Sequence, residues 1–204
     1  MLEKLFGSHA RVKLLKLFYL NSDSIFPPKD VARRAHITAT VMRRELRVLE
    51  AAGFIKKATG FIEIPNKKDK KKIQKKRISG YKIDTSFQLF DELRELVLTV
   101  APLSKKDLTQ KLRRVGKVKL VVLAGIFLKE SGARVDMLIV GDALKKGQLD
   151  WTLRMIESEV GKELDYVILD TADFKYRTGM NDKFMRDVFD YPHEIIIDKI
   201  GFVK

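Results

Sequence analysis

Arginine and threonine side chains recur on one face of residues 38–52. Helical spacing puts Thr40, Arg44 and Arg47 on one side, with Arg43 beside them. Arginine can form two hydrogen bonds with a guanine edge, and threonine can reach a phosphate or a thymine methyl group. The pattern favours a helix that reads the major groove of DNA; the alternative is a solvated arginine face on an ordinary helical bundle. The opposite side is apolar and consists of Met42, Leu46 and Leu49.

A second basic feature follows at residues 67–77, which hold eight basic residues and one acidic residue. Residues 54–57 and 61–64 have the composition of short strands, and residues 78–83 have that of a return strand. We therefore expect the basic segment to join two strands of a hairpin and to lie along a phosphate backbone. The alternatives are a solubilising loop or a localisation signal. The basic residues are Lys67, Lys68, Lys70, Lys71, Lys72, Lys75, Lys76 and Arg77.

Motifs for catalysis or metal binding are missing from the sequence. The three histidines, at positions 9, 36 and 193, are scattered and lack the spacing of metal ligands. There is no Walker loop, nucleophile elbow or zinc-protease motif. With no cysteine, disulfides, thiolate metal sites and cysteine nucleophiles are excluded. We expect Trp151, the one tryptophan, to belong to the core.

The net charge of +14 is unevenly distributed. Residues 1–86 hold 21 basic against 8 acidic residues, a net charge of +13, and residues 87–204 are nearly neutral at +1. Such an asymmetry indicates a polyanionic partner for the first half, either nucleic acid or an anionic membrane surface. No apolar run approaches the roughly 20 residues that span a bilayer, and the N-terminus lacks the pattern of a signal peptide, so we expect a cytoplasmic protein.

The surrounding segments predict the elements that position these residues. Apolar side chains at helical spacing, from Leu5 to Phe18, predict a first helix that Ser8 can cap. A second helix is predicted over 29–35, before the helix at 38–52, for which Thr38 is a good N-cap. Residues 87–100 are amphipathic and followed by a short helix at 105–115. We expect them to join two domains or to pair in a dimer.

The second half alternates predicted strands and helices. Strands are expected at 118–124, 135–140, 164–169 and 194–197, with helices around Trp151 and after residue 170. Alternation of this kind predicts a mixed or mostly parallel sheet covered by helices.

Residues 8–15 and 43–55 resemble the winged helix-turn-helix domain of prokaryotic transcriptional regulators. The Arg-Arg-Glu-Leu run that begins at Arg43 and ends at Gly53 is typical of the recognition helix leading into the wing. In that family the third helix enters the major groove and the hairpin wing rests on the adjacent backbone or minor groove. The resemblance covers about residues 1–86 and implies phosphate contact for the basic segment, which is longer than a usual wing. It implies base reading for Thr38, Thr40, Arg43, Arg44 and Arg47.

Residues 116–201 resemble the minimal nucleotidyltransferase domain of the DNA polymerase β type. In that family a Gly-Ser pair follows the first strand, and an acid-x-acid pair on the second strand and a third acid hold two divalent metals. This chain has Gly-Ile at 125–126 and Arg134 at the first acid position, so only Asp136 remains, with Asp165 as a candidate third acid. Because hard cations need several oxygen ligands, we expect a degenerate domain without metal, in which Asp136 forms a local salt bridge.

Together these observations predict an α+β fold. We expect a winged helix over residues 1–86, a helical linker or dimer interface over 87–115, and a nucleotidyltransferase-like domain over 116–204. The leading hypothesis is a transcriptional regulator that binds double-stranded DNA as a homodimer, with a dimerising or sensing second domain, no cofactor and no membrane partner. The alternatives are an active nucleotidyltransferase that holds nucleic acid through its basic domain, and a binder of structured RNA.

Overall fold

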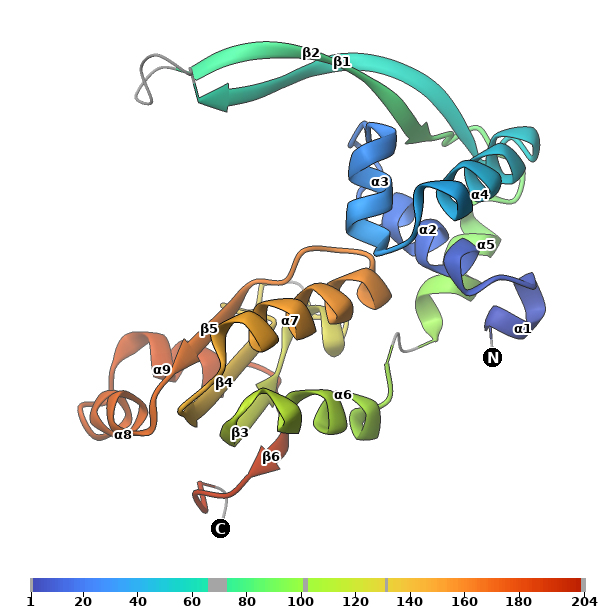
Figure 1. Cartoon of the computed structure of the whole chain (residues 1–204). Helices are drawn as coiled ribbons and strands as arrows, with labels where there is room; N and C mark the ends of the chain where they lie inside the picture. Colours follow the sequence, from blue (N-terminus) through green and yellow to red (C-terminus); the bar gives the residue numbers. More distant parts are fainter. Residues whose placement is uncertain (1, 66–72, 101–102, 131, 203–204) are drawn as a thin grey trace. The chain divides into compact units, whose positions relative to one another are not determined.

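The computed structural model describes residues 2–65, 73–100, 103–130 and 132–202 (Figure 1). The fold is mixed α+β with two small sheets, in agreement with the predicted class. The chain divides into two compact units. One comprises Met1–Pro102 with Ser158–Lys162, and the other comprises Leu103–Glu157 with Glu163–Lys204.

The helices of the first unit begin at side chains that cap them. Ser8 Oγ accepts a hydrogen bond from Arg11 N–H at 3.2 Å, and Thr38 Oγ1 accepts one from Val41 N–H at 3.4 Å. Pro28 occupies the first position of its helix, where a missing N–H costs nothing. The unit contains α1 (Leu2–Phe6), α2 (His9–Tyr19), α3 (Pro28–Ala35), α4 (Ala39–Ala51) and α5 (Phe90–Thr99). The helices predicted at 29–35 and 38–52 are thus confirmed, and the apolar pattern that begins at Leu5 is divided between two helices, α1 and α2, by a break at Gly7 and Ser8.

Aromatic rings hold α2, α5 and the start of the hairpin around one core. Phe18 and Tyr19 of α2 both pack edge-on against Phe54, the residue before the hairpin. Phe90 packs against Tyr19, whose hydroxyl donates a 2.9 Å hydrogen bond to the Phe90 carbonyl oxygen. Val97 of α5 is fully buried in the same core. The apolar side of residues 87–100, a segment that we expected to join two domains or to pair in a dimer, therefore packs largely within this unit.

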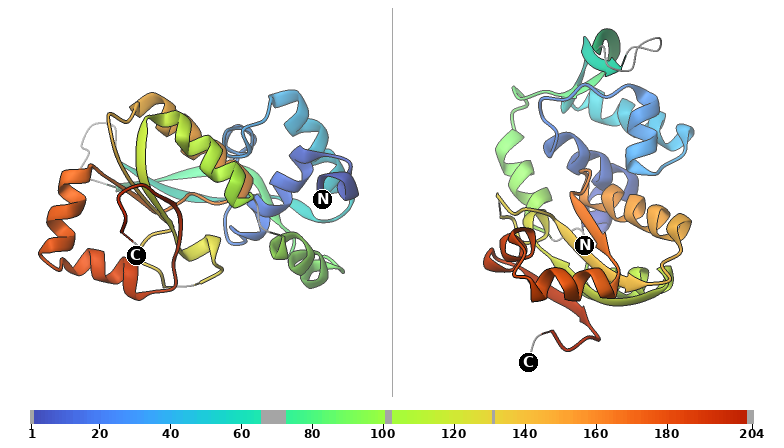
Figure 2. Two further views of the ribbon diagram at one scale, coloured as in Figure 1. Left: turned by 90° about the horizontal axis from the view of Figure 1, so that it is seen from below. Right: turned by 90° about the vertical axis from the view of Figure 1, so that its left-hand side faces the viewer.

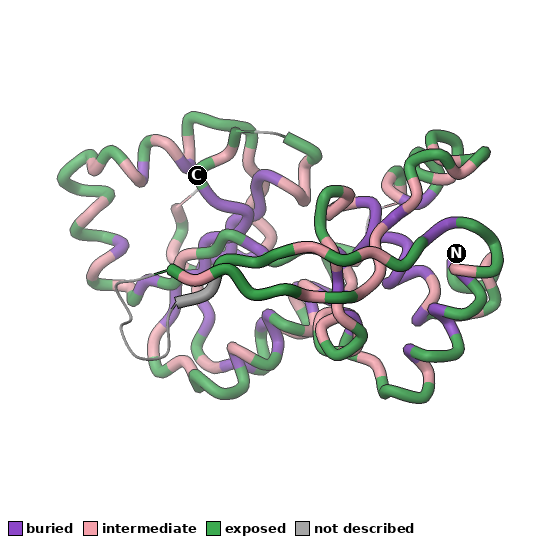
Figure 3. Tube along the Cα trace, turned by 90° about the horizontal axis from the view of Figure 1, so that it is seen from above, coloured by how far each residue is buried: buried purple, intermediate pink, exposed green. Residues whose placement is uncertain are grey.

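A long antiparallel hairpin follows α4. Strand β1 (Ile55–Pro65) pairs with β2 (Ile73–Ile83), and each strand has 11 residues. At about 3.4 Å per residue the ladder runs for roughly 35 Å, and Figure 3 shows most of it exposed. The prediction that the return strand begins at residue 78 is wrong, because residues 73–77 already belong to β2. Ladder hydrogen bonds use only main-chain groups, so lysine-rich stretches can extend a strand whenever their side chains reach water.

The base of the hairpin is joined to the segment before α3. The N–H of Phe26 donates to Tyr81 O at 2.8 Å, and the N–H of Tyr81 donates to Phe26 O at 2.9 Å. A Cβ atom on Gly80 would lie 2.2 Å from the Phe26 carbonyl oxygen. Glycine at position 80 therefore permits the close approach that anchors the hairpin to the helices.

The second unit is built on a four-stranded mixed sheet in the order β5-β4-β3-β6. The β4–β5 pair is parallel, and β3 is antiparallel to both β4 and β6, as expected for a mixed sheet. The strands are β3 (Lys117–Leu123), β4 (Met137–Asp142), β5 (Tyr166–Leu169) and β6 (Glu194–Asp198). The helices are α6 (Lys105–Leu112), α7 (Lys146–Val160), α8 (Thr171–Gly179) and α9 (Lys183–Asp190), with 3-10 turns η1 (Arg113–Val115) and η2 (Gly125–Phe127).

Helices cover both faces of this sheet. Phe174 of α8 and Met185 of α9 pack with Leu120 and Leu138 on one face, and Figure 2 shows α6 and α7 on the other side. The expectation that Trp151 belongs to the core is wrong, because this residue of α7 is 57% exposed. The buried stripe of α7 within this unit passes through Leu149, Leu153 and Ile156, and Trp151 lies outside that helical spacing.

Candidate nucleic-acid interface

The outward face of α4 carries the polar residues expected from the sequence. The apolar stripe faces the core and is nearly inaccessible, with 3 to 5% exposure for Met42, Leu46 and Leu49. The structure therefore presents one side of α4 to solvent along its whole length. The five predicted base-reading residues, all of them exposed, are Thr38, Thr40, Arg43, Arg44 and Arg47.

One carboxylate is buried beneath this exposed face. Glu45 is 1% exposed and accepts hydrogen bonds from Ser8 Oγ and Arg11 Nε, both at 2.9 Å. The neighbouring Arg44 also donates to it, from Nη2 at 3.0 Å. Glu45 thus ties α4 to the start of α2 and holds the guanidinium of Arg44. Sequence reasoning missed this network, although a glutamate on the apolar side of an amphipathic helix was the available signal.

The environment of Glu45 favours its charged form. Burial alone would raise the pKa of the carboxyl group, but the hydrogen bonds from Ser8, Arg44 and Arg11 together outweigh it, so the pKa lies below its ordinary value. A carboxylate that accepts from two arginines is stabilised by charge-assisted bonds. Glu45 therefore remains ionised at neutral pH and serves as a fixed negative anchor inside the unit.

Arg43 and Arg47 differ from Arg44 in their partners. In the described part of the chain, neither forms an ion pair or a side-chain hydrogen bond. Their guanidinium groups extend into solvent from consecutive turns of α4. A guanidinium group that has no acceptor within the protein can use all of its N–H donors to bind a partner molecule.

The outer part of the hairpin adds further cations. Lys75, Lys76 and Arg77 are adjacent in β2, all exposed, and form no ion pair with any described residue. Strand alternation directs Lys75 and Arg77 to one face of the ladder and Lys76 to the other. Because β1 supplies only one acid, Glu63, the described strands form a basic ribbon. The other predicted phosphate contacts, Lys67, Lys68, Lys70, Lys71 and Lys72, lie outside the described residues.

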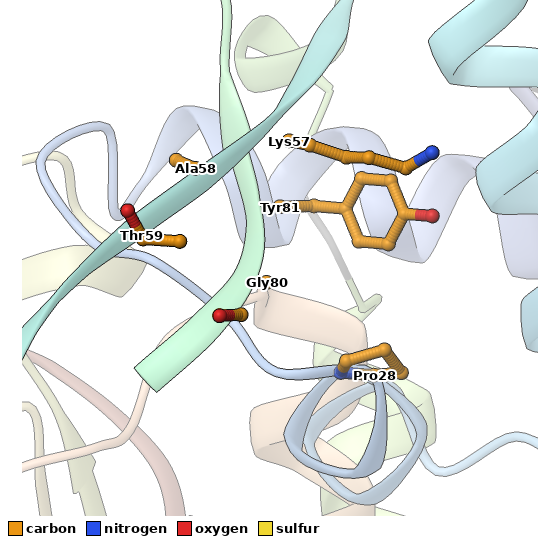
Figure 4. Close-up of a pocket in the computed structure, with 7 residues that line it drawn as sticks. Pro28, Lys57, Ala58, Thr59, Gly80 and Tyr81 are labelled. Carbon is orange, nitrogen blue, oxygen red and sulfur yellow. The ribbon is translucent and has the colours of Figure 1, made fainter. Parts of the chain in front are cut away.

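A pocket of about 450 Å³ lies where the hairpin meets the start of α3 (Figure 4). Figure 4 shows Lys57 and Tyr81 side by side from neighbouring strands, above Pro28. Lys57 Nζ lies 3.4 Å from Glu50 Oε1 of α4, so the ammonium group forms an ion pair with this carboxylate. This pocket was not predicted, because its wall arises from strand pairing between residues distant in sequence. Its lining consists of Pro28, Lys57, Ala58, Thr59, Ser79, Gly80 and Tyr81.

Apolar side chains on the outer part of the ribbon form a second unpredicted feature. Phe61 and Ile73 are each 70% exposed, and Ile62 is 41% exposed. Phe61 lies opposite Arg77 in the ladder, and Ile62 lies opposite Lys76. The ribbon therefore presents cations and apolar groups together.

In the second unit, both carboxylate oxygens of Asp136 accept hydrogen bonds from main-chain N–H groups. Its Oδ1 accepts from Ile126 N–H at 2.9 Å, and its Oδ2 accepts from Asp165 N–H at 3.0 Å. Among the residues described, Asp136 forms no ion pair, so the expected salt bridge is wrong: backbone amides from two loops reach the carboxylate instead. A Cβ on Gly125 would lie 2.3 Å from Asp136 Oδ1, so glycine is needed there.

The side chains of the two predicted relic acids behave differently. Asp136 is 9% exposed, whereas Asp165 is exposed and binds Asp136 through its main chain. Over the described ranges, no group of three or more histidine or acidic residues is arranged to hold a metal ion. Through its two hydrogen bonds, Asp136 therefore joins the turn at residues 125–126 to the start of β5.

In comparisons with known proteins, no family model, curated protein or solved structure matches the chain. No helix within the described residues is both long and apolar enough to cross a membrane.

Proposed function

We propose that this chain binds double-stranded DNA through α4 and the β1–β2 hairpin, and that it acts as a transcriptional regulator. The observation that carries the proposal is the exposed face of α4, where Arg43 and Arg47 lack internal acceptors within the described residues. An arginine pair at this spacing suits bidentate contacts with guanine edges in a major groove.

The order of elements in the first unit supports a winged helix-turn-helix arrangement. Helix α2, the bridge at Phe26, α3, α4 and the hairpin follow one another, and the bridge anchors the hairpin beside the helices. In this arrangement α4 supplies sequence preference and the ribbon supplies affinity. Phosphate contacts carry no sequence information but fix the register of a protein on the duplex.

For the second unit we propose a role in assembly or sensing rather than catalysis. The succession of β3, the Gly-Ile turn, β4, α7 and β5 supports a nucleotidyltransferase-like arrangement. The bonds of Asp136 to two backbone amides favour a structural task for the remaining acid. If labelled nucleotides with Mg²⁺ gave transfer that Asp136→Ala abolished, this part of the proposal would be overturned.

Selection of bound sequences from a random duplex pool tests the DNA-binding proposal with the full chain. We expect enrichment of a defined site, and a palindromic site would indicate the proposed homodimer. The affinity should fall with salt at a slope of about −0.9 per phosphate contact. Structured RNA that bound as tightly as the selected duplex at matched salt would overturn the proposal in favour of an RNA binder.

A further inference from the structure

We propose that Phe61 is a wedge that enters between base pairs of duplex DNA from the minor groove, while cations of the same hairpin hold the flanking phosphates. The inference rests on the proposed DNA-binding function and goes beyond it. It assigns deformation of the DNA, in addition to charge neutralisation, to the hairpin.

The exposure of Phe61 is unusual within this chain. All twelve phenylalanines lie in the described residues, and Phe61 is the only one that is exposed rather than buried or half-buried. Burying a phenylalanine side chain stabilises a protein, and Phe61 does not contribute this stabilisation in its unit. An aromatic ring held in water by a regular ladder is available for an external apolar surface.

The ladder fixes the surroundings of this ring. Phe61 pairs with Arg77, and directly opposite residues of an antiparallel pair have Cβ atoms about 5 Å apart. Lys75, two residues before Arg77, projects on the same face. A ring that enters a base stack at this point would bring both cations close to the sugar-phosphate strands. Phenylalanine is one of the apolar side chains with which minor-groove proteins separate base steps.

A second apolar group lies on the same face. Ile73 pairs with Pro65, four residues along β1 from Phe61, which corresponds to about 13 Å. It is also 70% exposed, so the ring is not an isolated surface residue. This distance between Phe61 and Ile73 corresponds to the rise of roughly four base pairs. Ile73 would therefore lie over the groove, and not in the base-pair step that Phe61 enters.

The charges favour duplex DNA as the occupant. On the face that carries Phe61, the two cations Arg77 and Lys75 outnumber the one acid, Glu63. A minor groove has phosphates along both walls, which long basic side chains beside an inserted ring can reach. A single strand has only one line of phosphates, and an apolar protein surface would leave the buried cations without a partner.

Fluorescence of a base analogue in the duplex tests the wedge directly. The probe is a mixed-sequence duplex of about 30 base pairs with 2-aminopurine at flexible TA steps and a dye at each end. The full chain should raise the 2-aminopurine signal and shorten the distance between the ends. We expect Phe61→Ala to lose both effects and to weaken binding about tenfold, with an unchanged salt slope, because base stacking is lost and phosphate contacts are kept. Phe61→Leu should retain part of the distortion.

Ile62→Ala is the matched control, because it removes an exposed apolar side chain from the other face of the same strand. It should leave the fluorescence and the end-to-end distance close to those of the unsubstituted chain. Equal distortion by Phe61→Ala and the unsubstituted chain would overturn the wedge, as would a dimer in sedimentation that Phe61→Ala dissolves, or stronger binding to single strands that depends on Phe61. If the full chain bound no duplex, the proposed function itself would fail, which is a distinct outcome.

Discussion

The exposed face of α4 and the two carboxylates at the ends of β4, Asp136 and Asp142, all carry charge, yet they use it differently. Asp136 directs both oxygens to backbone amides, and Asp142 accepts from Lys119 and Thr171, bonds that lower its pKa to about 2. Arg43 and Arg47, in contrast, have no acceptor among the described residues. Charges with complete internal bonding stabilise a fold, whereas charges without it remain available to a partner.

The same contrast occurs between neighbours on α4. Arg44 and Arg47 are both exposed and both belong to the predicted base-reading set, but Arg44 is held by Glu45 at 3.0 Å. Contact between Arg44 and a guanine would compete with that bond. Position on the outward face is therefore a weaker guide to base reading than the absence of an internal acceptor.

The largest expected effect comes from removal of the ribbon cations. The triple substitution of Lys75, Lys76 and Arg77 by serine should flatten the salt slope by about 2.7 and reduce DNA affinity about a thousandfold at about 50 mM salt. A filter-binding titration over a range of salt concentrations measures both quantities. The matched control replaces three exposed cations of the second unit, Lys175, Lys183 and Arg186, and should change the slope little. If both triples acted alike, net charge rather than the ribbon would govern binding.

Asp136→Asn tests whether a carboxylate with complete internal hydrogen bonding stabilises the second unit. The amide keeps the size of the side chain but turns an NH₂ group toward a backbone N–H, and hydrogen bonds to a charged acceptor are lost. We expect the free energy of unfolding of the second unit to fall by about 3 kcal/mol, as measured by denaturant titration. DNA affinity should be retained under conditions where the variant is folded. Unchanged stability would show that the carboxylate is not needed for the fold.

Arg47→Ala should relax sequence preference. Loss of a bidentate contact costs about 2 kcal/mol for the preferred base and little for the others. Competition between the selected site and single-base variants of it measures this difference. Arg44→Ala is the comparison variant, and we expect a smaller loss of preference because its guanidinium is already engaged by Glu45. Equal losses would remove the distinction drawn between the two arginines.

The smallest effect is expected for Glu45→Gln, and it depends on pH. Since the pKa of Glu45 is lowered in the folded state, its contribution to stability is present above the unfolded pKa of about 4.3 and is lost as the pH falls below that value. The substitution should therefore lower the free energy of unfolding of the first unit by about 1 kcal/mol at neutral pH. The difference should shrink on acidification, and unfolding curves from pH 7 to 3 would show it. A difference that stayed constant with pH would assign the loss to packing alone.

Much of the local structure could be predicted because it depends on neighbours in the chain. Thr38 caps α4 as expected, the stripe of Met42, Leu46 and Leu49 is buried, and the strand predicted at 118–124 is β3 with a one-residue shift. Caps and buried stripes follow from the spacing of residues within a single element.

The order of the sheet and the partners of single side chains could not be predicted in the same way. The lysine-rich residues 73–77 are paired in a strand because β1 continues opposite them, and their composition alone indicated a loop. Trp151 is exposed because the buried stripe of α7 takes a different set of positions. Nor did composition reveal the pocket beside Pro28, which exists only where the paired strands meet α3.

By itself, the sequence determined the helix caps, the amphipathic faces and the concentration of positive charge in the first half of the chain. These properties follow from residue type and short-range spacing. Tertiary structure alone decided which charges are satisfied: Glu45 meets Ser8 and Arg11 from 34 or more residues away, and Asp136 meets an amide 29 residues further on. Hydrogen bonds act over about 3 Å, so only the folded chain determines which donor reaches which acceptor.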